Sequence, residues 1–231
     1  MSTSPPPPPP HYAGHRQRLR ARFLKSNGED LADYELIELL LCAVMPRRDV
    51  KPIAKALMHR FGGFAGVLNA NSDELQKIDG MGEAAAVSLM AMRQAAVRLL
   101  QNEVINQPVL GNWQSLMDYC RVAMGHNATE QFRVLFLNHK NILIADELQQ
   151  EGTIDHTPVY PREVIKRALD LSASALILVH NHPSGDPKPS AADIAITREL
   201  QAAGEKLGIS LHDHIVVSKT GNNSFKSLGL L

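Results

Sequence analysis

Residues 175–193 read ALILVHNHPSGDPKPSAAD and combine the signals of a strand, a turn and a helix start. Residues 175–179 form an apolar run of the length and composition of a buried strand. The prolines and the glycine after it predict a turn. A helix is then expected over residues 193–207, ended by Gly208. This part of the chain is therefore expected to fold as an α/β arrangement.

Two histidines, His180 and His182, directly follow the predicted strand. Side chains at i and i+2 lie on the same face of a strand, with Cα atoms about 6.7 Å apart. Both imidazoles can then converge on one cation, because Zn–N bonds are about 2.0–2.1 Å long. Asp193, beyond the turn, is a candidate third ligand. Two histidines and one carboxylate leave a zinc position for water, which is typical of a catalytic site.

Asp193 also fits a second interpretation. Ser190 and Asp193 have the spacing of a capping box, in which a serine and an acid three residues later bind backbone N–H groups at a helix start. The carboxylate would then serve the helix, and His180 and His182 would be ordinary residues at the end of a strand. The residues by themselves leave both interpretations open.

The spacing resembles the signature of JAB/MPN (JAMM) metalloprotease domains, which is His-x-His, seven residues and then Ser-x-x-Asp. The matching positions are His180, His182, Ser190 and Asp193. The segment HNHPSG is typical of the RadC-like branch, and the resemblance extends over residues 108–231. It implies a mixed sheet flanked by helices and one Zn²⁺ per chain, held by His180, His182 and Asp193. It also implies a zinc-dependent metallopeptidase-like hydrolase that cleaves an amide or isopeptide bond with a metal-activated water.

The resemblance implies two further catalytic residues. The family uses a glutamate from an upstream strand, and counting five residues back from Gly152 assigns this general base and acid to Glu147. Asp146 and Glu151 are nearby alternatives, and Glu147 can also be a solvated charge at a strand end. The Ser190 hydroxyl is expected to donate to the oxyanion of the attacked carbonyl. A peptide or protein is the expected substrate.

A second histidine pair, His212 and His214, repeats the i, i+2 spacing on a strand predicted over residues 211–218. No Ser-x-x-Asp follows this pair, so an independent zinc site is not expected there. The resemblance places Asp213 and His214 near the metal site, where they would orient the ligands from outside.

Two domains are expected after a disordered Pro-rich tail at residues 1–12, which contains six successive prolines. Residues 13–107 are predicted to be a small all-α domain, and residues 108–231 the JAB/MPN-type α/β (α+β) domain. Apolar spacing predicts helices over residues 34–44, 50–61, from 72 onwards and from about 83 to 100. In the second domain it predicts strands over residues 132–137 and 141–145 and helices over 113–123 and 161–170.

The turn at residues 80–82, Gly-Met-Gly, resembles a helix-hairpin-helix element. Such a turn can approach a phosphate closely and present free N–H groups at the next helix start. Ala85 replaces a lysine that is common in RadC-like chains, and Glu83 adds a negative charge, so both weaken a DNA-binding interpretation. The alternative is a packing hairpin that binds nothing.

Basic residues gather in a short segment after the tail: Arg16, Arg18, Arg20, Arg22 and Lys25. Such a segment can contact phosphates, or it can be the solvated face of a short helix. DNA is therefore a candidate partner. The alternative function is a non-enzymatic DNA-binding or repair accessory protein that uses the helical half, with the MPN domain as a scaffold.

The composition is that of an ordinary globular protein with a net charge of zero. No apolar run approaches the length of about 18 residues that a transmembrane helix needs, so no membrane is expected. The N-terminal residues do not have the pattern of a secretory signal. Cys42 and Cys120 lie in apolar segments and are expected to be buried thiols without a disulfide framework. The expected location is the cytoplasm.

Overall fold

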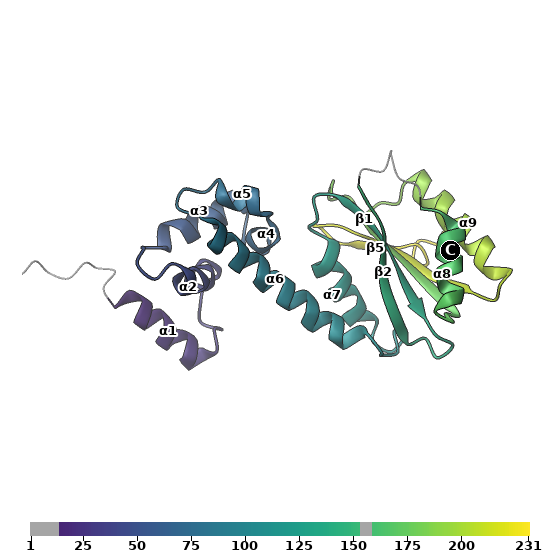
Figure 1. Ribbon diagram of the computed structural model, residues 1–231, viewed down its shortest axis with the longest axis horizontal. Helices are drawn as coiled ribbons and strands as arrows, with labels where there is room; N and C mark the ends of the chain where they lie inside the picture. The colour runs from purple at the N-terminus through teal and green to yellow at the C-terminus, as the bar shows by residue number, and fades with distance from the viewer. Residues whose placement is uncertain (1–13, 153–158) are drawn as a thin grey trace, which may run out of the picture. The chain divides into compact units, whose positions relative to one another are not determined.

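The computed structural model describes residues 14–152 and 159–231 (Figure 1). The predicted disordered tail at residues 1–12 lies outside the described residues. Among the described residues, no helix combines the length and the apolar character needed to cross a membrane.

The chain divides into two compact units, one ending at Gln94 and the next beginning at Ala95. The division falls inside helix α6 (Glu83–Val104), whereas the sequence places the boundary after residue 107. The last turns of α6 belong to the second unit, because Val104 is buried in the core of that unit.

The first unit is helical, as predicted. Its helices before α6 are α1 (His15–Ser26), α2 (Asp33–Val44), α3 (Lys51–Phe61), α4 (Phe64–Asn69) and α5 (Ser72–Gln76). Leu41 and Ile37 are buried one turn apart on α2, and Leu57 and Ile53 repeat this spacing on α3. Each helix therefore buries one stripe of apolar side chains in a common core.

A glycine turn joins α5 to α6. Gly80 has a φ of +89°, a left-handed conformation that glycine adopts without strain. Arg48 donates from Nη1 to the Gly80 carbonyl oxygen at 3.3 Å, and Ala85 is buried in the core. The two helices expected on either side of the Gly-Met-Gly turn are present, and contact of this turn with DNA stays a prediction.

The second unit contains a five-stranded mixed sheet with the order β2-β1-β3-β4-β5. The strands are β1 (Glu130–Leu137), β2 (Leu143–Gly152), β3 (Ala175–Asn181), β4 (Ser210–Val217) and β5 (Asn222–Ser224). β3 and β4 are parallel and every other neighbouring pair is antiparallel. The predicted mixed sheet flanked by helices is confirmed.

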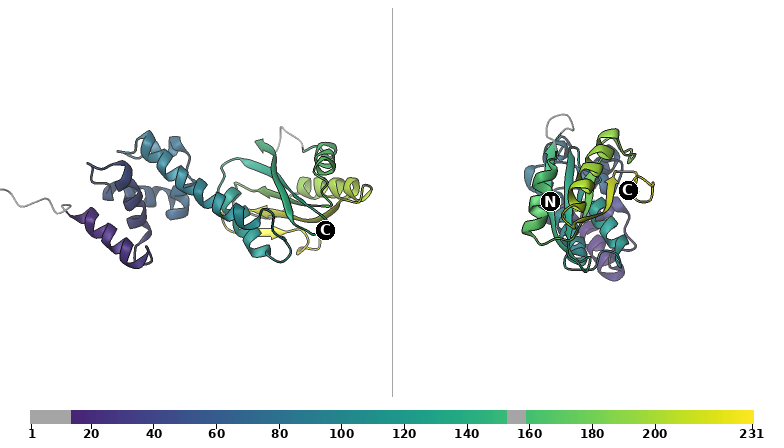
Figure 2. Two further views of the ribbon diagram at one scale, coloured as in Figure 1. Left: turned by 60° about the horizontal axis from the view of Figure 1, so that its bottom comes forward. Right: turned by 90° about the vertical axis from the view of Figure 1, so that its right-hand side faces the viewer.

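Helices cover both faces of this sheet (Figures 1 and 2). The helix α7 (Trp113–Met124) packs on one face, and α8 (Pro161–Asp170) and α9 (Ala191–Glu205) pack on the other. Successive residues of β3 alternate between these two cores, so Ile177 faces α7 and Leu178 faces α8 and α9. This double burial explains why the strand is a continuous apolar run.

Candidate metal centre

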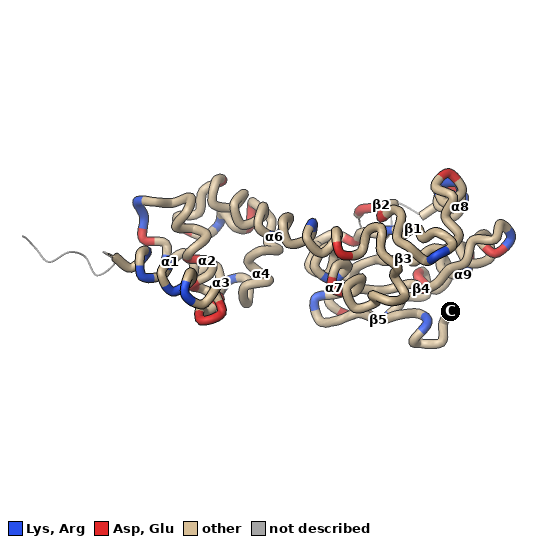
Figure 3. The backbone as a smooth tube through the Cα atoms, turned by 90° about the horizontal axis from the view of Figure 1, so that it is seen from below, with Lys and Arg blue, Asp and Glu red and all other residues tan. Residues whose placement is uncertain are grey.

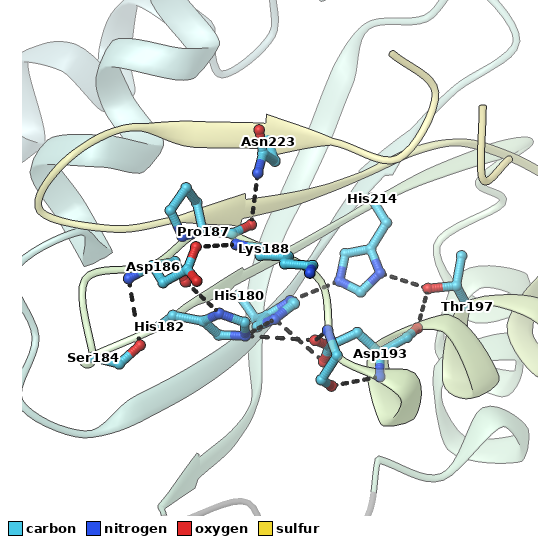
Figure 4. Close-up of polar contacts among 11 residues, drawn as sticks. His180, His182, Ser184, Asp186, Pro187, Lys188, Asp193, Thr197, His214 and Asn223 are labelled. Atoms are coloured by element: carbon cyan, nitrogen blue, oxygen red, sulfur yellow. Dashed lines mark hydrogen bonds and ion pairs between the residues drawn. The ribbon is translucent and has the colours of Figure 1, made fainter. Parts of the chain in front are cut away.

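The end of β3 and the start of α9 bring the three predicted ligands together (Figure 4). The Nε2 atoms of His180 and His182 lie 2.9 Å apart. Asp193 Oδ1 is 3.3 Å from His180 Nε2 and Oδ2 is 3.5 Å from His182 Nε2. Two ligand atoms of a tetrahedral zinc site with bonds of about 2.0–2.1 Å lie about 3.3 Å apart. The donor atoms therefore have the spacing that a zinc ion requires.

A chain of hydrogen bonds fixes the proton of His180 on Nδ1. The Thr197 hydroxyl donates to the main-chain carbonyl of Asp193, so its oxygen accepts from His214 Nδ1 at 2.6 Å. His214 Nε2 then accepts from His180 Nδ1 at 2.8 Å. Burial lowers the pKa of His214 well below its ordinary value, which keeps the ring neutral and able to accept.

His182 is oriented in the same way, because its Nδ1 donates to the Asp186 carbonyl oxygen at 2.8 Å. The Nε2 atoms of His180 and His182 therefore each carry a lone pair, and these lone pairs face each other. Two lone pairs cannot share a hydrogen bond, whereas one cation between them binds to both. The residues present thus fit a divalent metal ion, with outer partners that fix both ring orientations.

Asp193 serves the helix and faces the histidines at once. Ser190 Oγ accepts from the Asp193 N–H at 3.1 Å, and Asp193 Oδ2 accepts from the Ser190 N–H at 2.7 Å. Burial opposes ionisation of Asp193, whereas the hydrogen bonds with Ser190 favour the ionised carboxylate and lower its pKa. The capping box is therefore present, and it leaves an ionised carboxylate against both imidazoles.

Glu130, the first residue of β1, completes the group. The donor atoms of Glu130, His180, His182 and Asp193 all lie within 4.8 Å of one another. β1 runs antiparallel to β3 with Phe132 opposite His180, so the start of β1 reaches the end of β3 where the histidines lie. Partial burial raises the pKa of Glu130 above its ordinary value. Sequence reasoning missed this residue.

Glu147 lies outside this group. It sits on the edge strand β2 opposite Val134, and its Oε1 is 2.6 Å from Nη2 of Arg167 on α8. The upstream glutamate beside the histidines is Glu130, which corrects the assignment made by counting back from Gly152. The count stays on β2, whereas the glutamate beside the histidines is on β1, the strand that pairs with β3.

Asn181 fixes the backbone on both sides of Glu130. This fully buried residue accepts through Oδ1 from the Gln131 N–H at 2.8 Å. Its Nδ2 donates to the carbonyl oxygens of Thr129 at 3.1 Å and Asn127 at 3.4 Å. The residue between the two histidines in the chain therefore holds the glutamate-bearing segment in register with them.

The turn between the ligands is attached to the β4–β5 hairpin. Thr220 Oγ1 donates to the Gly185 carbonyl oxygen at 2.6 Å, and Asn223 Nδ2 donates to the Pro187 carbonyl oxygen at 3.0 Å. Asn223 and the turn are visible above His182 in Figure 4. These bonds fix the path of the chain from the histidines to Asp193.

The second histidine pair does not converge on one point. The register of β4 against β3 shifts at His212, so this residue and His214 point differently despite their spacing. His212 Nε2 lies 2.6 Å from Asn141 Oδ1. His214 instead lies beside His180, where the family resemblance places it.

Comparisons with known proteins cover most of the chain. The family model of the RadC-like JAB domain matches residues 110–230, and that of the UPF0758 N-terminal domain matches residues 13–87. The chain belongs to the RadC-like JAB family. A UPF0758 protein from Rhodobacter capsulatus is 56% identical over 213 residues, which is 92% of this chain and 100% of that protein.

The RadC-like JAB match contains every member of the candidate metal centre, Glu130 included. The resemblance inferred from the His-x-His and Ser-x-x-Asp spacing is therefore confirmed. The helices α1 to α5 and the glycine turn before α6 fall in the UPF0758 N-terminal match.

Proposed function

We propose that this RadC-like JAB protein is a zinc-dependent hydrolase of the metallopeptidase type, which cleaves an amide or isopeptide bond in a peptide or protein. The observation that carries the proposal is the pair of facing Nε2 lone pairs of His180 and His182, 2.9 Å apart, with the Asp193 carboxylate beside them. Family membership supports it, because JAB domains include metalloproteases.

His180, His182 and Asp193 would hold the ion. Neutral imidazole nitrogens and an ionised carboxylate form a donor set that suits zinc. When bound, a zinc ion polarises a carbonyl group and activates water at neutral pH.

Glu130 would take a proton from the attacking water and deliver it to the leaving amine. Proton transfer of this kind is most effective when the pKa of the carboxyl lies near the working pH, and burial moves the pKa of Glu130 in that direction. Asn181 would hold Glu130 in place for this task through the bonds to its neighbours.

Ser190 would stabilise the oxyanion that forms at the attacked carbonyl. Its oxygen accepts from the Asp193 N–H in the capping box, which leaves the hydroxyl hydrogen available to donate. The same serine would thus cap α9 and face the substrate.

The non-enzymatic alternative, DNA binding through the glycine turn, has less support. Glu83 is the first residue of α6, so a negative charge stands at the helix start where a phosphate would bind. We therefore favour the hydrolase.

Hydrolysis of a panel of peptides and isopeptide-linked peptides by the zinc-loaded full chain tests the proposal. We expect Glu130→Gln to lower the rate by about 10²–10⁴-fold, the usual contribution of general acid–base catalysis. Glu147→Gln is the matched control, because it makes the same change outside the group, and it should keep the parental rate. No hydrolysis by the parent, or a parental rate in Glu130→Gln, would refute this scheme.

A further inference from the structure

The first unit contains a cleft between α1, α2 and the loop that joins α2 to α3. Its volume is about 690 Å³, within the range of about 300–1,000 Å³ that small-molecule sites occupy. Its charged lining consists of Arg16 and Arg20 from α1, Glu38 from α2, and Arg47, Arg48 and Asp49 from the loop. Four arginines against two acids give the lining a formal charge of +2.

One of these arginines builds the wall of the cleft. The Arg16 guanidinium donates to the main-chain carbonyl oxygens of Met45, Pro46 and Arg48. It therefore attaches the loop to α1 with three of its five N–H groups. Arg48 makes one further bond across the cleft wall, to the Gly80 carbonyl oxygen.

Two carboxylates also line the cleft, and both are included in its formal charge of +2. Glu38 is only 1% exposed, and its Oε1 accepts from His15 Nε2 at 2.7 Å. Asp49 accepts from the Lys51 N–H at 3.1 Å, at the start of α3. Asp49 and one oxygen of Glu38 are therefore engaged with the protein, whereas Glu38 Oε2 is buried without a hydrogen-bond partner.

Arg20 and Arg47 are exposed and, among the described residues, form no hydrogen bond or ion pair. Figure 3 shows Lys and Arg positions along α1 and next to α2 and α3. Guanidinium groups gathered around one cavity repel each other, and a multiply charged anion between them relieves this repulsion. The planar fork of arginine matches the oxygens of a phosphate group.

We propose that this cleft binds the phosphate group of a small phosphomonoester, separately from the metal centre. A dianionic phosphomonoester matches the formal charge of the lining, and the volume leaves room for the group that carries the phosphate. Arg20 and Arg47 line one cavity, whereas a nucleic-acid backbone is expected to follow a stripe of basic residues. Arg22, also on α1, forms an ion pair with Glu35, in which Nη1 lies 2.7 Å from Oε1.

Calorimetric titration of the full chain at low ionic strength tests the proposal, with inorganic phosphate, adenosine 5′-monophosphate and glucose 6-phosphate as probes. We expect inorganic phosphate and at least one ester to bind and to compete with each other. The ester that binds more tightly distinguishes a nucleotide from a sugar phosphate. The double variant Arg20→Gln, Arg47→Gln should weaken binding at least tenfold. Both side chains are exposed, so an unchanged melting temperature would show that the variant folds.

The control is Lys25→Gln, which removes a charge from the same helix outside the cleft and should leave the affinity unchanged. An oligonucleotide without terminal phosphates is a fourth probe. We expect the double variant Arg20→Gln, Arg47→Gln to have the same affinity for it as the parent. The proposal would be overturned if neither phosphate nor an ester bound. It would also be overturned if Lys25→Gln lost as much affinity as the double variant. Tight oligonucleotide binding that depends on the same arginines would also overturn it.

Discussion

His214 contributes to the candidate metal centre through His180 and not by facing the ion. Its ring stacks on Phe225 with centroids 4.5 Å apart and meets the edge of Phe132 at 5.6 Å. This apolar packing holds the ring where Nε2 accepts from His180 Nδ1. The proton of His180 is thereby kept away from the atom that faces His182.

We expect His214→Leu to weaken zinc binding about 10–100-fold, the usual effect of losing an outer partner of a ligand. Leucine keeps the buried volume and removes the acceptor. Competition with a chromophoric chelator measures the affinity, and His212→Leu, which changes a histidine outside the group, is the control. Equal affinities in the parent and His214→Leu would show that the chain of hydrogen bonds is irrelevant to the ion.

The three ligands that are close in the sequence could be predicted, whereas Glu130, which is far from them in the sequence, could not. His180, His182 and Asp193 lie on one strand–turn–helix segment, and the resemblance of their spacing to the JAMM signature indicates that they form one site. The position of Glu130 depends on which strand pairs with β3 and in which register. The available signal is an acid two residues before the apolar run that begins at Phe132.

Among the elements, the pairing of β1 with β3 does most to assemble the site. Asn181 at the end of β3 forms one hydrogen bond with Gln131 of β1 and two with Asn127 and Thr129, just before this strand. Loss of these bonds would leave the N–H of the half-buried Gln131 without its acceptor, and a donor that is shielded from water and unpaired costs more than the bond itself contributes.

We therefore expect Asn181→Leu to lower the free energy of unfolding by about 1–3 kcal/mol and to speed hydrogen exchange at the Gln131 amide. Urea denaturation and exchange measured by NMR provide the two readouts. Asn222→Leu, at an exposed position on β5, should change stability by less than about 0.5 kcal/mol. If Asn181→Leu changed neither the free energy of unfolding nor the exchange rate of the Gln131 amide, the β1–β3 junction would not need this side chain.

The contact between α1 and α2 predicts a pH effect. Arg22 Nη1 is 2.7 Å from Glu35 Oε1, and this hydrogen bond, working against burial, holds the pKa of Glu35 below its ordinary value. A lowered folded pKa means that the pair stabilises the fold above the unfolded pKa of about 4.3. This contribution is lost as the pH falls through the folded pKa.

Glu35→Gln should consequently lose less stability than the parent when the pH falls from about 6 to 3. Thermal unfolding of both proteins at several pH values measures the difference. If the melting temperatures of both proteins changed with pH in parallel over the whole range, the ion pair of Glu35 with Arg22 would not stabilise the fold.

Apolar spacing was a better guide to helices and buried strands than to edge strands. The helix α8 has the bounds expected from sequence, and β3 differs only by including His180 and Asn181. The strand β2 was expected over residues 141–145 but extends to Gly152. Its second half is polar because β2 is an edge strand that is only partly covered, and the pattern of a buried strand is absent there.

At the scale of the whole molecule, the two units carry different chemistry. The metal centre belongs to the RadC-like JAB unit, and the arginine cleft belongs to the helical unit. The boundary between the units was hard to place from sequence because α6 is one continuous helix whose two ends are buried in different cores. Pro108 follows the end of α6 at Val104 by four residues.

Zinc analysis of the purified full chain tests most directly whether His180, His182 and Asp193 hold one metal ion. The account predicts about one zinc per chain in the parent, as in mononuclear sites of this ligand type. It predicts the same content in His212→Ala and almost none in His182→Ala. Equal zinc contents in the parent and His182→Ala would contradict it.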